Sequence, residues 1–204
     1  MKRQLIVLLV LVSGLFASLA SRAELVIRIT DGTNDGIPVM IVPFQGGDLA
    51  GVIEADLQRT GLFTLIDPAK AGQALAMGQP FQTEPLRASG AEYVIVGKQV
   101  GSLEFEILNA ATGKRTAGYR IAQIGNTRRM GHKAADLIFE RLTGKRGAFD
   151  TQVAYVSANG PAKAQTYQLI VADADGFNPR TILRSNKPVM SPSWSPDGNR
   201  LAYV

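Results

Sequence analysis

The chain has 204 residues, a formal net charge of +5, 46% hydrophobic residues, no cysteine and one histidine. This length is enough for one or two domains. The lack of cysteine excludes disulfides, thiol nucleophiles and a cysteine-linked lipid anchor, and the single histidine excludes metal sites built from several His or Cys side chains.

Residues 1–23 have the composition of a secretory signal peptide. The basic start Lys2-Arg3 precedes a continuous apolar run over residues 5–19 and the small-x-small site Ser21-Arg22-Ala23. The alternative is an uncleaved membrane helix, but the run is short for spanning a bilayer. Cleavage after Ala23, with Ala20 as the other candidate site, removes three basic residues and no acidic ones, so the charge falls from +5 to +2. We expect an exported protein with no membrane span after cleavage.

Residues 24–36 predict a mobile strand and loop. Glu24–Thr30 has a strand-like pattern, and the loop that follows, Asp31–Gly36, is polar and rich in glycine. Such a strand can be the first strand of its own domain, or it can add to the sheet edge of another protein. The sequence leaves both possibilities open.

Residues 37–147 alternate between strand and helix patterns and predict an α/β sandwich domain with helices on a mixed sheet. The expected elements are a strand over 39–44, a helix capped by Asp48 and ended by Gly61, a strand over 62–66, a weak helix from Pro68 to Met77, a loop over 78–85, a strand over 91–100, antiparallel strands over 103–108 and 115–123, and a helix from Asn126 or Thr127 to Gly144.

Residues 150–204 contain only strand and turn patterns. Four strands are expected over 153–157, 167–172, 180–184 and 190–194, and residues 199–204 begin another. The run Val153-Ala154-Tyr155-Val156 recurs 48 residues later as Leu201-Ala202-Tyr203-Val204. A repeat of about this length is typical of β-propeller blades. Because one blade cannot bury both faces of its sheet, we expect the chain to be a truncated part of a longer propeller protein.

No catalytic, cofactor-binding or metal-binding residue is predicted. His132 falls at the edge of the apolar face of its helix, where a hydrogen-bonded or solvated histidine is expected. Glu104 and Glu106 share the solvent face of a strand, and Arg128-Arg129 is expected to be a surface pair. The segment 173–178 has two acids, as a calcium loop does, but it lacks the remaining ligands and predicts a turn.

Several segments together resemble the TolB family, the periplasmic components of the Tol-Pal system. They are the export signal, the mature start 24–29, the strand 38–44, the segment 131–144 and the propeller segments 153–156 and 193–203. The resemblance covers essentially the whole chain. It implies an α/β domain followed by a six-bladed propeller, in a monomeric, non-enzymatic protein without cofactors or nucleic-acid partners.

The resemblance also implies two protein partners in the Gram-negative periplasm. The propeller of the family binds the peptidoglycan-associated lipoprotein Pal, and the mature N-terminus binds TolA, a link that serves outer-membrane integrity and constriction at cell division. By position, the TolA-binding residues are Glu24, Leu25, Val26, Ile27, Arg28, Ile29, Thr30, Asp31 and Asp35. No Pal-binding residue is carried over, because that surface belongs mainly to later blades.

The alternative function is the N-terminal part of an exported propeller-containing hydrolase. Its catalytic residues would follow Val204, since no G-x-S-x-G motif and no nucleophile with a base occurs in this chain. A G-x-S-x-G domain after the propeller would favour hydrolysis, whereas further blades alone would favour binding.

Overall fold

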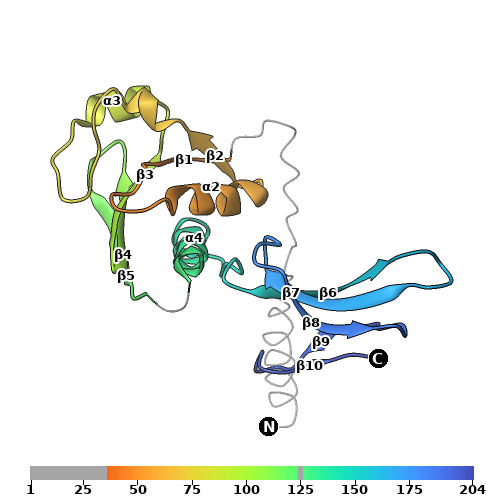
Figure 1. Ribbon diagram of the computed structural model, residues 1–204. Coiled ribbons are helices and arrows are strands. Elements are labelled where there is room, and N and C mark those ends of the chain that lie inside the picture. The colour runs from red at the N-terminus through yellow and green to blue at the C-terminus, as the bar shows by residue number, and fades with distance from the viewer. Residues whose placement is uncertain (1–35, 124–125) are drawn as a thin grey trace, which may run out of the picture. The chain divides into compact units, whose positions relative to one another are not determined.

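A computed structural model describes residues 36–123 and 126–204, and Figure 1 labels its elements. The expected signal peptide and the segment Glu24–Asp35 lie outside the described residues. The first part of the structure is a sheet in the order β2-β1-β3-β4-β5. Its strands are β1 (Ile37–Ile41), β2 (Phe63–Ile66), β3 (Tyr93–Val100), β4 (Ser102–Asn109) and β5 (Arg115–Ile121). Because β1 is parallel to β2 and β3 while β4 and β5 are antiparallel, the sheet is mixed, as predicted.

Helices cover both faces of this sheet (Figure 1). α2 (Ala50–Arg59) and α4 (Thr127–Thr143) pack against each other over one face. The short helices η1 (Pro68–Ala71) and α3 (Thr83–Ala88) cover part of the other face. None of the helices in residues 36–123 and 126–204 has the length and apolar character that crossing a bilayer requires.

The strands supply both cores because their side chains alternate between the two faces. Val39 and Ile41 enter the core beneath α2 and α4, whereas Met40 enters the core beneath η1 and α3. On β4, the expected alternation is also present: Leu103, Phe105 and Ile107 are fully buried beneath α2 and α4.

Glu104 and Glu106 lie on the opposite face of β4 from those three residues. Each is ion-paired with a neighbouring strand, Glu104 with Lys98 at 3.1 Å and Glu106 with Arg115 at 3.0 Å. Opposite charges across strands stabilise a sheet locally. The two residues alternate with the buried ones, as the sequence predicted, but their side chains are only 25% and 16% exposed and pair with basic residues on neighbouring strands.

The long helix α4 has the predicted ends. The Asn126 side chain accepts a hydrogen bond from the backbone N–H of Arg129, and Gly144 ends the helix with φ of 72°. At Gly131, α4 approaches α2 so closely that a Cβ atom would lie 2.9 Å from Val52 Cγ1. This close approach places His132, the next residue, against α2.

Three predictions for the α/β domain are wrong. β1 ends at Ile41, before the predicted Phe44, because Pro43 has no N–H to donate to a sheet. Asp48 does not cap α2, which begins after the buried Leu49 without a side-chain cap. The helix predicted from Pro68 to Met77 is only the short η1, which stops at Gly72 with φ of 63°.

α3 occupies part of the predicted loop 78–85. The loop was predicted from the proline and glutamine content of this segment, but Pro85 is the third residue of α3. Proline is tolerated in the first turn of a helix, where its missing N–H has no partner to lose.

The second part of the structure consists of strands only. β6 (Gln152–Asn159), β7 (Thr166–Asp173) and β8 (Arg180–Ser185) form one antiparallel sheet. β9 (Ser193–Trp194) and β10 (Leu201–Ala202) form a separate hairpin.

The predicted fourth strand, 190–194, does not pair with β8. Met190 instead exchanges two backbone hydrogen bonds with Val204. Pro188 and Pro192 lack N–H donors, and Ser191 has φ of 52°, so this segment cannot continue the ladder of β8. The apolar side chains of Val153, Tyr155 and Ile182 are exposed. In a propeller, such faces pack against neighbouring blades.

Candidate functional site

A buried histidine–aspartate pair connects α4 with α2. His132 on α4 is 2% exposed, and Asp56 on α2 is fully buried. The ring atom Nδ1 of His132 lies 2.6 Å from Oδ2 of Asp56, whose Oδ1 accepts a hydrogen bond from Arg59. The pair fixes the orientation of the imidazole ring and aims its other nitrogen, Nε2, away from α2.

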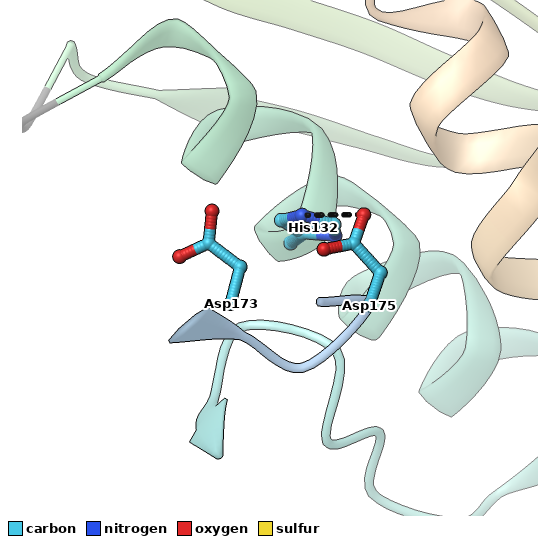
Figure 2. Close-up of side chains that lie close together, drawn as sticks. All are labelled: His132, Asp173 and Asp175. Atoms are coloured by element: carbon cyan, nitrogen blue, oxygen red, sulfur yellow. Dashed lines mark ion pairs between the residues drawn. The ribbon is translucent and has the colours of Figure 1, made fainter. Parts of the chain in front are cut away.

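Asp175 meets this nitrogen from the turn that follows β7 (Figure 2). Its Oδ2 lies 3.7 Å from His132 Nε2 and also accepts a hydrogen bond from Arg128. Its Oδ1 accepts one from the backbone N–H of Phe177 at 3.0 Å, and the Arg128 guanidinium lies 4.3 Å from the centre of the Phe177 ring. Asp175 and Phe177 thus attach the β7–β8 turn to α4.

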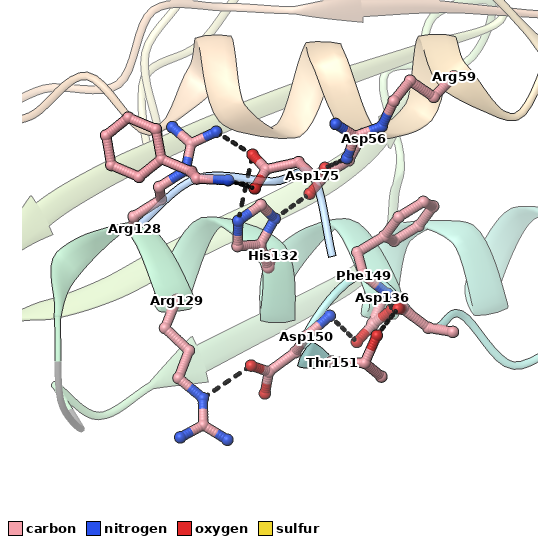
Figure 3. A network of polar contacts seen from close by, with 12 residues as sticks. Asp56, Arg59, Arg128, Arg129, His132, Asp136, Phe149, Asp150, Thr151 and Asp175 are labelled. Atoms are coloured by element: carbon pink, nitrogen blue, oxygen red, sulfur yellow. Dashed lines mark hydrogen bonds and ion pairs between the residues drawn. The ribbon is translucent and has the colours of Figure 1, made fainter. Parts of the chain in front are cut away.

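A second group of contacts holds the segment between α4 and β6, and Figure 3 shows both groups together. Asp136 on α4 accepts hydrogen bonds from the backbone N–H groups of Phe149 at 2.7 Å and Asp150 at 3.2 Å. Arg129 Nε donates to Asp150 Oδ1 at 2.7 Å. Glycine is required at position 147, because a Cβ atom there would clash with the Asp136 carboxylate. Through these contacts α4 positions the first strand of the propeller region.

The charges of this network shift two pKa values. The hydrogen bond with the Asp56 carboxylate raises the pKa of His132 above its ordinary 6.5, although burial and the charge of Arg128 act in the opposite direction. Burial acts to raise the pKa of Asp175, but hydrogen bonds from Arg128 and from the Phe177 amide outweigh it and hold this pKa below its ordinary value. The folded protein therefore favours a charged His132 next to a charged Asp175.

His132 is expected to titrate with a midpoint above 6.5 in chelator-treated protein, because Asp56 favours the imidazolium. Because the pKa of His132 is higher in the folded than in the unfolded protein, its protonation stabilises the fold. This stabilisation is fully present below pH 6.5 and is lost as the pH rises through the pKa of His132 in the folded protein. The C2-proton NMR signal of the only histidine measures the midpoint directly. Asp56→Asn is expected to lower it, whereas Asp150→Asn should leave it in place. A midpoint at or below 6.5 would contradict this account.

A cavity of about 790 Å³ lies beside the network. Its lining includes the basic residues Arg129 and Arg180 and the acidic residues Asp150 and Asp173, together with His132. Because both signs of charge occur in it, the cavity as a whole is not selective for anions or for cations. His132 and Asp173, with Asp175 near by, are the side chains that could hold a metal ion here.

The structure decides three expectations about these residues. His132 is hydrogen-bonded, one of its two predicted states, but it is buried more deeply than its edge position suggested. The predicted surface position holds for Arg129, whose side chain is 61% exposed, whereas Arg128 is only partly exposed. Both side chains pair with carboxylates that lie far along the chain. The segment 173–178 is a turn, as predicted, closed by a hydrogen bond from the N–H of Gly176 to the carbonyl of Asp173.

Asp56 was not singled out from the sequence, although a signal for it exists. It lies seven residues after Leu49, four after Val52 and three after Ile53, which places it on the apolar face of α2. An acid on the buried face of a helix requires a partner. The only histidine in the chain was the obvious candidate.

Comparison with known proteins identifies relatives for both parts of the chain. Residues 25–116 match the family described as the TolB amino-terminal domain, and residues 139–204 match the TolB beta propeller domain. The Tol-Pal system protein TolB of Thioalkalivibrio sulfidiphilus is 41% identical over 91% of this chain, and that of Xanthomonas oryzae pv. oryzae (strain PXO99A) is 39% identical over 92%.

A solved structure shows the same fold. The crystal structure of TolB from Acinetobacter baumannii is 30% identical in sequence and superposes with a TM-score of 0.73 over 82% of this chain. The chain spans 46% of the length of the two relatives named above and 43% of this third one. The likeness therefore covers most of this chain and somewhat less than half of each relative.

Proposed function

The chain belongs to the TolB family, and from this premise we propose that it acts in the periplasm as a protein-interaction component of the Tol-Pal system. The observation that carries the proposal is the 41% identity, over 91% of the chain, to a protein named Tol-Pal system protein TolB. Export to the periplasm is supported by the signal-peptide composition of residues 1–23.

The proposed partners are TolA and Pal, which the protein links in outer-membrane integrity and in constriction at cell division. We assign TolA to Glu24–Asp35, where a strand-like run precedes a polar loop and so suits addition to the sheet edge of a partner. We assign Pal to the propeller, without naming residues.

The network around α4 supports a role in which one domain influences the other. Arg128 contacts the β7–β8 turn, while Asp136 and Arg129 hold the segment that leads into β6. Because these contacts converge on a single helix, α4 connects the start of the propeller with the α/β domain. α4 in turn packs against α2 and the sheet.

The propeller-hydrolase alternative has no observation in its favour. The ring nitrogens of His132 face the carboxylates of Asp56 and Asp175, and within the described part of the chain no hydroxyl group is hydrogen-bonded to it. That environment suits a connecting residue better than the base of a nucleophile.

Deleting residues 24–35 from the full protein is expected to abolish TolA binding in isothermal titration calorimetry, because the deletion removes the strand that would pair with TolA. Ile27→Asp places a charge in the middle of that strand and should weaken binding strongly. Thr33→Ala/Asn34→Ala is a matched control, since it alters the loop of the same segment but not the proposed strand. An unchanged affinity after the deletion would refute the assignment.

A further inference from the structure

Three side chains from two elements converge beside α4. In the part of the chain that the structure describes, His132, Asp173 and Asp175 are the one group of three His or acidic residues whose ligand atoms all lie within 4.8 Å of one another. Figure 2 shows both carboxylates rising from the end of β7 and the turn after it, with Asp175 ion-paired to His132 and Asp173 farther to the side. The group combines one imidazole nitrogen with carboxylate oxygens, all of which are metal ligands.

The histidine presents an unused nitrogen to this group. Nε2 of His132 is buried and has no hydrogen-bond partner. The side chain as a whole is only 3% exposed, and its contact with Asp56 holds it in place. Its other nitrogen, Nδ1, is held by the Asp56 carboxylate at 2.6 Å. A metal-binding histidine commonly donates one ring N–H to a carboxylate and so directs its other nitrogen to the ion. Asp56 gives His132 this orientation.

The spacing of two of the three ligand groups, those of His132 and Asp175, suits a small ion. His132 Nε2 and Asp175 Oδ2 are 3.7 Å apart. Two tetrahedral ligands that bind one zinc ion at about 2.1 Å lie roughly 3.4 Å from each other, so the two atoms need to move only slightly to share an ion. His132 and Asp173 also line the cavity, which leaves room for water in a fourth position.

From these observations we propose that His132, Asp173 and Asp175 bind a divalent first-row transition metal ion. Zinc fits the mixed nitrogen and oxygen ligands best, because imidazole favours transition metals over Ca²⁺ and Mg²⁺. An ion in this position connects α4 with the β7–β8 turn. The site differs from the calcium loop that the acids of 173–178 first suggested, because it depends on His132.

Arg128 competes with such an ion. Its guanidinium already pairs with Asp175, and Asn178 donates a hydrogen bond to Asp173 at 3.1 Å. A metal ion must share the Asp175 carboxylate with Arg128 or displace the arginine from it. The affinity for the metal is therefore set by competition with Arg128 at Asp175 and with the proton on His132 Nε2, which must leave before that nitrogen can bind an ion. Removing the arginine should shift this competition toward the metal.

Calorimetric titration of the untagged, chelator-treated full protein with Zn²⁺ tests the proposal. One ion is expected to bind per chain, and Co²⁺ should give the visible absorption of a nitrogen- and oxygen-ligated ion. Asp173→Asn, which keeps the side-chain shape, and His132→Ala each remove a proposed ligand. Each is expected to weaken Zn²⁺ binding about 100-fold or more, because losing a group that only orients a ligand already costs about 10–100-fold. Arg128→Gln should tighten binding several-fold.

Asp150→Asn is the matched control, because Asp150 lines the same cavity but lies outside the three ligands. Its Zn²⁺ affinity should equal that of the unaltered protein. The proposal is overturned if the unaltered protein binds no Zn²⁺, if Asp173→Asn binds it as tightly as the unaltered protein, or if Arg128→Gln binds it more weakly. These results are independent of TolA binding, so they do not depend on the proposed function.

Discussion

Asp56→Ala is expected to lower the free energy of unfolding by about 3–5 kcal/mol, because it breaks a buried ion pair by removing one partner. Asp56 is fully buried, and its two carboxylate oxygens contact His132 and Arg59. Without the carboxylate, the buried imidazole loses the negative charge that faces it and the hydrogen-bond acceptor for its Nδ1–H group. Urea unfolding followed by far-UV circular dichroism, with a chelator present, measures the loss.

Two further variants separate the charge of Asp56 from its hydrogen bonds. Asp56→Asn keeps an acceptor for the His132 N–H and should therefore cost about 1–3 kcal/mol, less than the alanine variant. Gln58→Ala is the control on the same helix, and because Gln58 is exposed its effect should stay within about 0.5 kcal/mol. A loss below about 1 kcal/mol for Asp56→Ala would show that the pair does not hold α2 and α4 together.

Local patterns predicted those parts of the fold that depend on neighbouring residues. The ends of α4 follow from Asn126 and Gly144, and the burial of β4 follows from its alternation of apolar and acidic residues. α3 falls partly in the predicted loop 78–85, whose proline content is compatible with a helix because Pro85 lies in its first turn. Burial of Leu49, a tertiary effect, overrode the capping preference that favoured Asp48.

The network around His132 could not be assembled from local patterns. Arg128 and Asp175 are 47 residues apart, and His132 and Asp56 are 76 apart. In the sequence, Arg128, His132 and Asp175 each have an ordinary local explanation, whereas Asp56 has none. Only the packing of α2 on α4 and the position of the β7–β8 turn bring them together. A buried-face acid such as Asp56 is the one local clue that a partner must exist.

Phe105→Ala is expected to lower the free energy of unfolding by about 3–5 kcal/mol, because it opens a cavity in the core between the sheet and the helices α2 and α4. Phe105 is fully buried, and its ring stacks on Tyr119 of β5 with a centroid distance of 5.1 Å. Phe105 pairs with Gly97 on the neighbouring strand β3. A Cβ atom added at Gly97 would come within 3.1 Å of both Phe105 and Phe44. The absence of a side chain at Gly97 makes room for the Phe44 ring and for the Cβ atom of Phe105.

The cavity explanation makes a graded prediction in the same unfolding measurement. Phe105→Leu keeps most of the apolar volume and should cost less than about 1.5–2 kcal/mol, whereas Tyr119→Leu removes only the stacked partner and should cost about 1 kcal/mol. If Phe105→Leu were as damaging as Phe105→Ala, the aromatic stack rather than the filled volume would stabilise this core. Because the same core lies beneath α2 and α4, its loss is also expected to loosen the helix pair that positions His132.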